Sequence, residues 1–75
     1  MQIRLKLMGF LKDKTPADGS LEVGDQATIN EVLAQLEIPA NYVQVLTVNG
    51  SFERNRDRAL AEGDELSVLP PVGGG

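Results

Sequence analysis

Few residues of this sequence carry side chains that do chemistry. The 75 residues include no cysteine and no histidine. Without thiols the chain can form no disulfide, thiolate zinc site, iron–sulfur cluster or catalytic cysteine. Without imidazole it lacks the commonest general base and any Ser–His–Asp triad. We therefore expect a protein that is not an autonomous enzyme.

The charged side chains also offer little chemistry. Seven basic and eleven acidic residues give a formal net charge of −4, the wrong sign for a protein that binds nucleic-acid phosphates. The acidic residues near the carboxyl end have no spacing typical of metal ligands, so we expect no bound metal, and Asp64-Glu65 is typical of a turn. Arg54, Arg56 and Arg58 form a basic cluster that we interpret as part of a solvated loop.

The sequence closes on Pro70-Pro71-Val72-Gly73-Gly74-Gly75, a run whose one reactive group is the α-carboxylate of Gly75. The two prolines favour a stiff, extended exit, and glycines pass through gaps that any Cβ would block. At about 3.3–3.6 Å per residue, this run reaches roughly 20 Å. We therefore expect it to enter a narrow site on a partner. The alternative is a frayed terminus with no function.

The elements that position this tail begin with a strand. Ile3, Leu5 and Leu7 alternate with polar residues, which predicts a strand with one buried face. Residues 12–19 are polar and rich in turn formers, so we expect a loop there. Residues 20–23 predict a second short strand, and the two strands are expected to pair as a hairpin.

A helix is predicted next. Thr28 and Glu31 have the spacing of a capping box, in which each side chain bonds the backbone N–H of the other residue. Apolar residues from Ile29 onward recur at i, i+3, i+4 and i+7, which places them on a single face. Pro39 is expected to end the helix after about ten residues. A helix this short needs a sheet to cover.

The second half of the chain predicts the remaining strands. Residues 42–48 are rich in β-formers and end at Asn49-Gly50, a strong turn signal that precedes a brief return strand. Residues 65–69 predict the last strand, with Leu66 and Val68 facing the core. The order of elements predicts an α+β fold, a mixed four- to five-stranded sheet with one main helix across it.

The sheet face that the helix leaves uncovered is the candidate docking surface. Val43 and Val45 share one face of the third strand, and Leu69 ends the last strand. We expect these three side chains to lie partly exposed on the uncovered face, where an apolar cluster would mark a partner site. The alternative is that they are additional core residues or scattered surface residues.

Three segments match one known family in order and spacing. They are Val48-Asn49-Gly50, Leu60 with Glu62-Gly63-Asp64-Glu65-Leu66, and Leu69-Pro70-Pro71-Val72-Gly73-Gly74-Gly75. Gly73 fills the position of the small residue before the final glycine pair. The start of the chain, Ile3 to Leu11, is similar to the molybdopterin synthase small subunit. With these matches the sequence resembles the MoaD/ThiS sulfur carriers, small ubiquitin-like β-grasp proteins that end in a Gly-Gly carboxylate.

The resemblance implies a β-grasp domain over residues 1–69 and a flexible tail over residues 70–75. It implies that an E1-like adenylyltransferase adenylates Gly75, with ATP and Mg²⁺ bound in that partner and no cofactor bound by this chain. A sulfur donor then produces a thiocarboxylate. An acceptor synthase, such as the molybdopterin synthase large subunit, receives the sulfur in molybdopterin biosynthesis. The tail residues that enter the partner would be Pro70, Pro71, Val72, Gly73 and Gly74.

Other functions stay open at this point. Within the same chemistry, the chain would supply sulfur for thiamine, an amino acid or a tRNA base. A ubiquitin-like modifier would be joined to lysine through Gly75, and a binding-only β-grasp domain would have an inert tail. The β-grasp ferredoxins are excluded, because no cysteine can hold their cluster.

The sequence also bears on where the protein resides. No apolar run approaches the ~20 residues of a membrane span, so we expect no membrane partner. Met1 to Leu7 lacks the apolar core of a signal peptide. We therefore expect a cytoplasmic protein.

Overall fold

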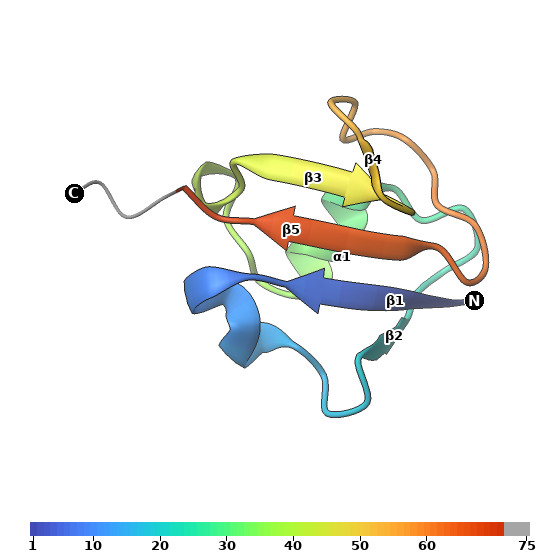
Figure 1. Cartoon of the computed structure of the whole chain (residues 1–75). Helices are drawn as coiled ribbons and strands as arrows, with labels where there is room; N and C mark the ends of the chain where they lie inside the picture. Colours follow the sequence, from blue (N-terminus) through green and yellow to red (C-terminus); the bar gives the residue numbers. More distant parts are fainter. Residues whose placement is uncertain (72–75) are drawn as a thin grey trace.

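Residues 1–71, which the computed structural model describes, form a mixed five-stranded sheet with one α-helix packed on one face (Figure 1). The strands are Gln2–Leu7 (β1), Ser20–Glu22 (β2), Val45–Val48 (β3), Ser51–Phe52 (β4) and Glu65–Leu69 (β5). The α-helix is Ile29–Gln35 (α1), and two 3₁₀ helices, Gly9–Lys14 (η1) and Ala40–Tyr42 (η2), precede β2 and β3. This order confirms the predicted α+β layout.

The strand order β2-β1-β5-β3-β4 puts the last strand of the chain in the middle of the sheet. β1 and β5 run parallel, whereas the other neighbouring pairs run antiparallel. β1 and β5 therefore end where the antiparallel β3 begins (Figure 1). Leu66 and Val68 of β5 face the core as predicted and are fully buried. The central strand thus anchors the chain just before the tail.

The first hairpin and the turn after β3 fold as the sequence predicts. Residues of β1 are alternately exposed and buried, and the strand pairs with β2 in an antiparallel hairpin. Asn49 and Gly50 both have positive φ, 52° and 87°. A type I′ turn requires this conformation at both central residues, and its twist matches that of the flanking strands. The turn fixes the register of β3 against β4.

The start of α1 also confirms the prediction. The Glu31 N–H donates to the Thr28 hydroxyl oxygen (3.2 Å), and the Thr28 N–H donates to the Glu31 carboxylate (3.0 Å). These reciprocal bonds complete the capping box and satisfy two backbone donors that the helix itself cannot satisfy. Ile29, Val32 and Leu33 form the buried face of the helix.

The helix ends earlier than predicted, after seven residues. Glu37 adopts a left-handed φ of 58°, and its N–H donates to the Ala34 carbonyl (3.0 Å). The Ile38 N–H donates to the Leu33 carbonyl (2.9 Å). These bonds form a Schellman motif, which ends the helix before Pro39 is reached. Because the left-handed residue is glutamate and not glycine, the sequence gives no clear sign of this end.

Two other segments differ from the prediction. The polar stretch over residues 12–19 is not entirely loop, because η1 extends to Lys14 and Leu11, only 1% exposed, anchors it to the core. Val43 is not a strand residue, since β3 begins at Val45. It directly follows η2 and is only 7% exposed. The prediction that Val43 lies partly exposed on the uncovered sheet face is therefore wrong.

Candidate functional site

The place where the chain leaves the sheet is fixed by hydrogen bonds on both sides of β5. The Val68 carbonyl accepts a bond from the Met8 N–H (3.1 Å), and the Leu69 carbonyl accepts one from the Gln44 N–H (2.8 Å). Pro70-Pro71 follows directly and is half-buried. Because both neighbouring segments hold the end of β5, the tail starts at a defined point of the domain.

The other predicted tail residues, Val72, Gly73, Gly74 and Gly75, lie outside the described residues. Their roles, above all the adenylation of Gly75, stay predictions. The part of the site that the structure describes is the base of the tail and the surface beside it.

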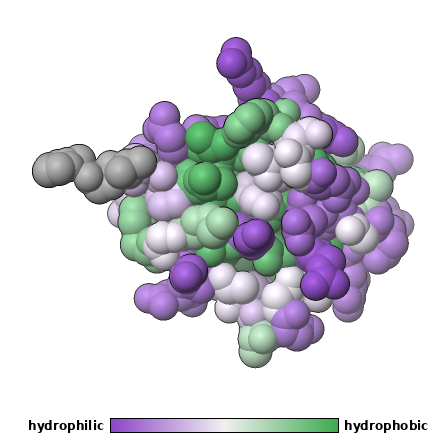
Figure 2. Space-filling view, in the orientation of Figure 1, coloured by the Kyte–Doolittle hydropathy of each residue, from purple (hydrophilic) through white to green (hydrophobic). Residues whose placement is uncertain are grey.

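The sheet face that α1 leaves uncovered is apolar next to the base of the tail. Figure 2 shows this face, with hydrophobic surface toward the end where the chain leaves β5 and hydrophilic surface toward the opposite end. Val45 of β3 pairs with Leu69 of β5, and both are half-buried. Farther from the tail, the pairs Lys6–Ser67 and Arg4–Glu65 make the sheet polar. The structure therefore brings together two of the three predicted docking residues.

Sequence reasoning missed two apolar residues on this face. Phe52 pairs with Thr47 across β3 and β4 and is 81% exposed. Met8 follows β1 and is half-buried. Because Leu7 of β1 pairs with Val68 of β5 and the two strands are parallel, the next residues, Met8 and Leu69, lie side by side. Strand parity would have found both, because Met8 continues the outward positions of β1 and the two-residue turn places Phe52 opposite Thr47. We call Met8, Val45, Phe52 and Leu69 the open-face cluster.

A groove of about 450 Å³ lies beside β3 and joins this cluster to the loop after β4. The residues that line it are Gln44, Val45, Leu46, Phe52, Glu53, Arg54 and Arg56. The groove exists because β4 covers only the last two residues of β3, Thr47 and Val48. The Glu53 N–H donates to the Leu46 carbonyl (2.9 Å), so within residues 1–71 the pairing on this edge of β3 ends before Val45, the residue nearest the tail.

The arginines of the predicted solvated loop have structural contacts. Arg56 donates to the carbonyls of Val43 (3.1 Å) and Ala40 (3.4 Å), and so ties the loop to the end of η2. Arg58 forms an ion pair with Glu53 (2.7 Å). The hydrogen bond from Arg58 is the main reason that the pKa of Glu53 lies below its usual value. Two of the three arginines thus help to fix the conformation of this loop.

The carboxylate of Asp64 serves the turn before β5, as predicted. It accepts hydrogen bonds from the Ala61 N–H (2.8 Å) and from the Asn49 side chain (2.9 Å). The bond from Ala61 is the first cause of a pKa below the usual value for Asp64. Asn49 in turn accepts a bond from the Glu65 N–H (2.9 Å). This network joins two turns, so both carboxylate oxygens have a structural role.

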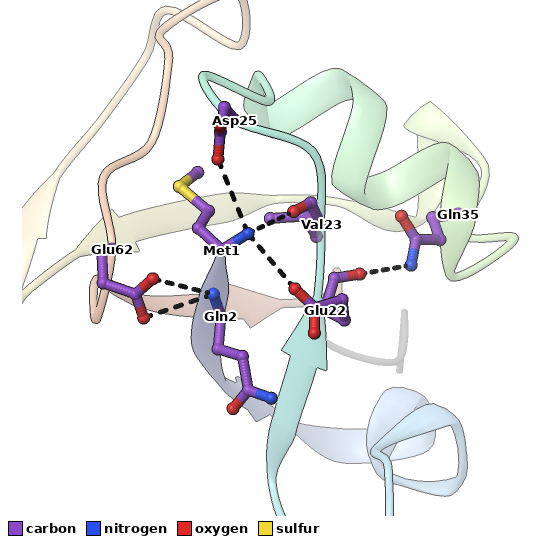
Figure 3. Close-up of polar contacts among 7 residues, drawn as sticks. All are labelled: Met1, Gln2, Glu22, Val23, Asp25, Gln35 and Glu62. Carbon is purple, nitrogen blue, oxygen red and sulfur yellow. Dashed lines mark hydrogen bonds and ion pairs between the residues drawn. The ribbon is translucent and has the colours of Figure 1, made fainter.

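A second polar cluster surrounds the amino terminus (Figure 3). The Met1 ammonium donates to the Val23 carbonyl (2.8 Å) and to Glu22 (3.2 Å), and lies 3.7 Å from Asp25. The bond to Glu22 is the main cause that raises the pKa of the ammonium. These acidic side chains therefore balance a positive charge. Within residues 1–71, no group of three or more acidic side chains is arranged to hold a metal ion.

The helices of the described part are short. None of them is long and apolar enough to cross a membrane.

Comparison with known proteins links this geometry to one family. The sequence model of the ThiS family matches residues 5–75. The molybdopterin synthase sulfur carrier subunit of Chlamydomonas reinhardtii is 29% identical to this chain, over 97% of this chain and all of that protein.

Solved structures share the fold. SAMP1 from Haloferax volcanii superposes with a TM-score of 0.73 at 23% identity, with both chains fully covered. A chain in the complex of subunits 1 and 2 of molybdopterin-converting factor from Helicobacter pylori superposes with a TM-score of 0.61 at 22% identity, again with full coverage of both. These likenesses confirm the expected ubiquitin-like β-grasp fold.

Proposed function

Because the chain belongs to the ThiS family, we propose that it is a sulfur carrier that works through a thiocarboxylate on Gly75. One observation supports this most directly. The buried central strand β5 passes straight into Pro70-Pro71, and the sequence then continues with a run of glycines. A rigid domain followed by residues without side chains suits a group that must enter a narrow active site on another protein.

Activation is needed because a carboxylate is a poor electrophile, being anionic and having oxide as its leaving group. In the proposed first step, a Gly75 carboxylate oxygen attacks the α-phosphorus of ATP and pyrophosphate leaves. The acyl-adenylate carbonyl is then attacked by sulfide, and AMP leaves. If the donor is a persulfide, its outer sulfur attacks the carbonyl and forms an acyl disulfide. A second thiol then attacks the donor's inner sulfur, and the donor and this thiol leave joined as a disulfide. Both routes leave a thiocarboxylate on Gly75.

Sulfur transfer follows from the nucleophilicity of this group. The thiocarboxylate sulfur attacks an electrophilic carbon of the acceptor and displaces a leaving group there, which forms a thioester. Water then attacks the thioester carbonyl, the C–S bond to Gly75 breaks, the sulfur stays on the acceptor as a thiol, and the Gly75 carboxylate is restored. The chain has no cysteine or histidine, so the acid–base groups, ATP and Mg²⁺ belong to the partners. The carrier supplies the carboxylate, the tail and a docking surface.

The open-face cluster is the proposed docking surface. Its members are apolar. Met8, Val45 and Leu69 lie beside the base of the tail, whereas Phe52 lies farther along the sheet, opposite Thr47, with its side chain mostly in contact with solvent. Burial of such residues at an interface is favourable, and aromatic side chains are frequent hot spots. The Helicobacter pylori relative was solved as a complex of two subunits, which supports an acceptor synthase as one of the partners.

Molybdopterin synthesis is the proposed pathway. The support is the likeness to the molybdopterin synthase sulfur carrier subunit, which extends over the full length of that protein. Sulfur delivery for thiamine, an amino acid or a tRNA base uses the same activated carboxylate and differs only in the acceptor. The pathway is therefore tested by the acceptor protein that is isolated with the thiocarboxylated chain.

The experiment that tests the carrier function is intact-mass analysis of protein isolated from its own cells. We expect a fraction in which one oxygen is replaced by sulfur, and fragmentation should place the sulfur on Gly75. A chain that lacks Gly75 is the control and should show no such fraction.

A second function has a structural neighbour in its favour, because SAMP1 is a small archaeal modifier protein. If Gly75 is found only in isopeptide bonds to lysine, the modifier function replaces the carrier function. If only the unmodified carboxylate is found in cells that actively make molybdopterin, both proposals are wrong.

A further inference from the structure

The base of the tail packs closely against the domain at Gly9. A Cβ placed on Gly9 would lie 2.9 Å from Cγ and 3.6 Å from Cδ of Pro70. A separation of 2.9 Å is shorter than any normal contact of a Cβ atom, so the Pro70 ring occupies space that only glycine leaves free. Among the other glycines of residues 1–71, none has an atom this close to its Cβ position.

We propose that Gly9 is a positioning residue, which sets the direction of the tail by letting the Pro70 ring pack against the start of η1. The proposal rests on the sulfur-carrier function, because it concerns how Gly75 is presented to the activating partner. Gly9 touches no reacting atom, and its effect passes through Pro70.

The backbone at Gly9 has little freedom to move away. The preceding residue, Met8, is bonded to Val68 of β5 (3.1 Å). Two residues later, Leu11 is buried in the core, and its N–H donates to the Met8 carbonyl (3.0 Å). Between them, the Phe10 ring packs edge-on against the Tyr42 ring of η2, with 5.3 Å between centroids. η1 is thus held by β5, by the core and by η2.

Pro70 is held from the other side. The Gln44 N–H bonds the Leu69 carbonyl, which belongs to the peptide group joining Leu69 to Pro70. The proline ring also fixes its own φ. Because the ring is part of the Pro70 backbone, a Cβ on Gly9 that displaces the ring also displaces this backbone, and the residues beyond it leave the domain in a different direction.

A small rotation at this point has a large effect at the reacting group. Every residue of the tail is attached through Pro70, so a change in its orientation changes the point from which Gly75 is presented. A displacement of about 1 Å at a reacting centre lowers a rate by on the order of 10²-fold. The open-face cluster, in contrast, keeps its place in the sheet.

The test compares Gly9→Ala with Gly19→Ala. Both glycines have positive φ, 56° and 74°, so both alanines carry backbone strain, but only the Cβ at position 9 meets Pro70. Adenylation is measured by ATP–pyrophosphate exchange with the E1-like enzyme that adenylates the wild-type chain. For Gly9→Ala we expect kcat to fall by about tenfold or more and KM to change by less than about threefold. Gly19→Ala should keep both values, while the two variants lose similar thermal stability.

Rescue separates positioning from other effects of the alanine. Pro70→Ala removes both Cγ and Cδ, so Gly9→Ala should lower kcat much less in the Pro70→Ala background than in the wild-type chain. The Gly9→Ala/Pro70→Ala variant should therefore have nearly the kcat of Pro70→Ala alone. If kcat falls equally in Gly9→Ala and Gly19→Ala, or if the double variant recovers nothing, the proposal is wrong.

A measurement on the free protein makes the test independent of the partner. In the wild-type chain we expect a nuclear Overhauser effect between the Gly9 Hα and Pro70 Hγ protons, and Gly9→Ala should shift the Val72 amide resonance. Absence of both effects overturns the proposal. If the contact is present and no adenylating enzyme accepts the wild-type chain, the sulfur-carrier function fails and the packing itself stands.

Discussion

Thr28 determines where α1 begins. Replacing it by alanine removes the hydroxyl oxygen that accepts the Glu31 N–H, whereas the backbone N–H of residue 28 can still donate to the Glu31 carboxylate. We expect Thr28→Ala to lower the free energy of unfolding by about 1 kcal/mol, measured by urea denaturation. Thr28→Ser keeps a hydroxyl at the same place and should retain most of that stability. An equal loss in both variants would mean that the cap does not act through its oxygen.

Phe52 is the residue of the open-face cluster at which a substitution best tests partner binding without a change in protein stability. Because its side chain is 81% exposed, Phe52→Ala should change the free energy of unfolding by less than about 0.5 kcal/mol. We expect it to weaken binding to the activating enzyme or the acceptor synthase by roughly 1 kcal/mol or more, measured by calorimetry.

Ala34 supplies the control for this prediction, because it is exposed on α1, across the sheet from the open-face cluster. Ala34→Glu should leave binding unchanged. If Ala34→Glu weakens binding and Phe52→Ala does not, docking uses the helix side of the domain.

Local sequence signals account for the residues that were predicted correctly. Thr28 and Glu31 are three positions apart, and Leu66 and Val68 follow strand parity, so neighbours along the chain suffice to place them. The contact between Gly9 and Pro70 joins residues from opposite ends of the chain. It depends on the parallel pairing of β1 with β5, which no local pattern in the sequence reveals.

At the scale of elements, the sequence predictions are wrong where the backbone changes conformation at a residue other than glycine or proline. Glu37 ends α1 in a left-handed conformation that glycine usually supplies. η2 runs to Tyr42, so the strand parity assigned to Val43 does not apply, and this residue turns into the core. Val45 and Leu69 were placed correctly on the open face because they lie within regular strands. Regular alternation is thus predictive only inside the element that produces it.

The charged amino terminus joins β1 to the segment after β2, and this makes stability depend on pH. The pKa of the Met1 ammonium is raised above its usual value of 8.0, first by the hydrogen bond to Glu22 (Figure 3). A raised pKa means that folding favours the protonated form. This contribution is therefore fully present below pH 8.0 and is lost as the pH rises through the pKa of the folded state.

We accordingly expect the urea concentration at the unfolding midpoint to decrease as the pH is raised from about 7 to above the pKa of the ammonium in the folded state. Glu22→Gln replaces the carboxylate, whose hydrogen bond is the first cause of the raised pKa, with a neutral amide. In this variant the midpoint should be lower at pH 7 and should fall less over the same range. An identical pH dependence in both proteins would show that the ion pair contributes nothing.

For the whole molecule, the strand order explains how so small a domain can present a tail. β5 is the last strand and lies between β1 and β3, so its burial is secured before the chain reaches Pro70. The resemblance of three segments to the MoaD/ThiS family predicted the class of protein from the sequence. The neighbours of the tail could not be predicted, because they are brought to it by the crossover between β1 and β5 and by the two 3₁₀ helices.

The division between domain and tail leads to the last prediction, which concerns Gly75 and Gly74. Gly75 carries no side chain to pack, so its deletion should leave the free energy of unfolding unchanged within about 0.5 kcal/mol. The same deletion should abolish ATP–pyrophosphate exchange, because the carboxylate then lies one residue, about 3.5 Å, short of its place. Gly74→Leu keeps the length of the tail and adds a side chain where the partner's channel is expected to be narrow. It should block the exchange without affecting stability, whereas Gly74→Ala, with the smallest side chain, should lose less activity. Full exchange by the Gly75 deletion would show that activation does not require the carboxylate to be at position 75.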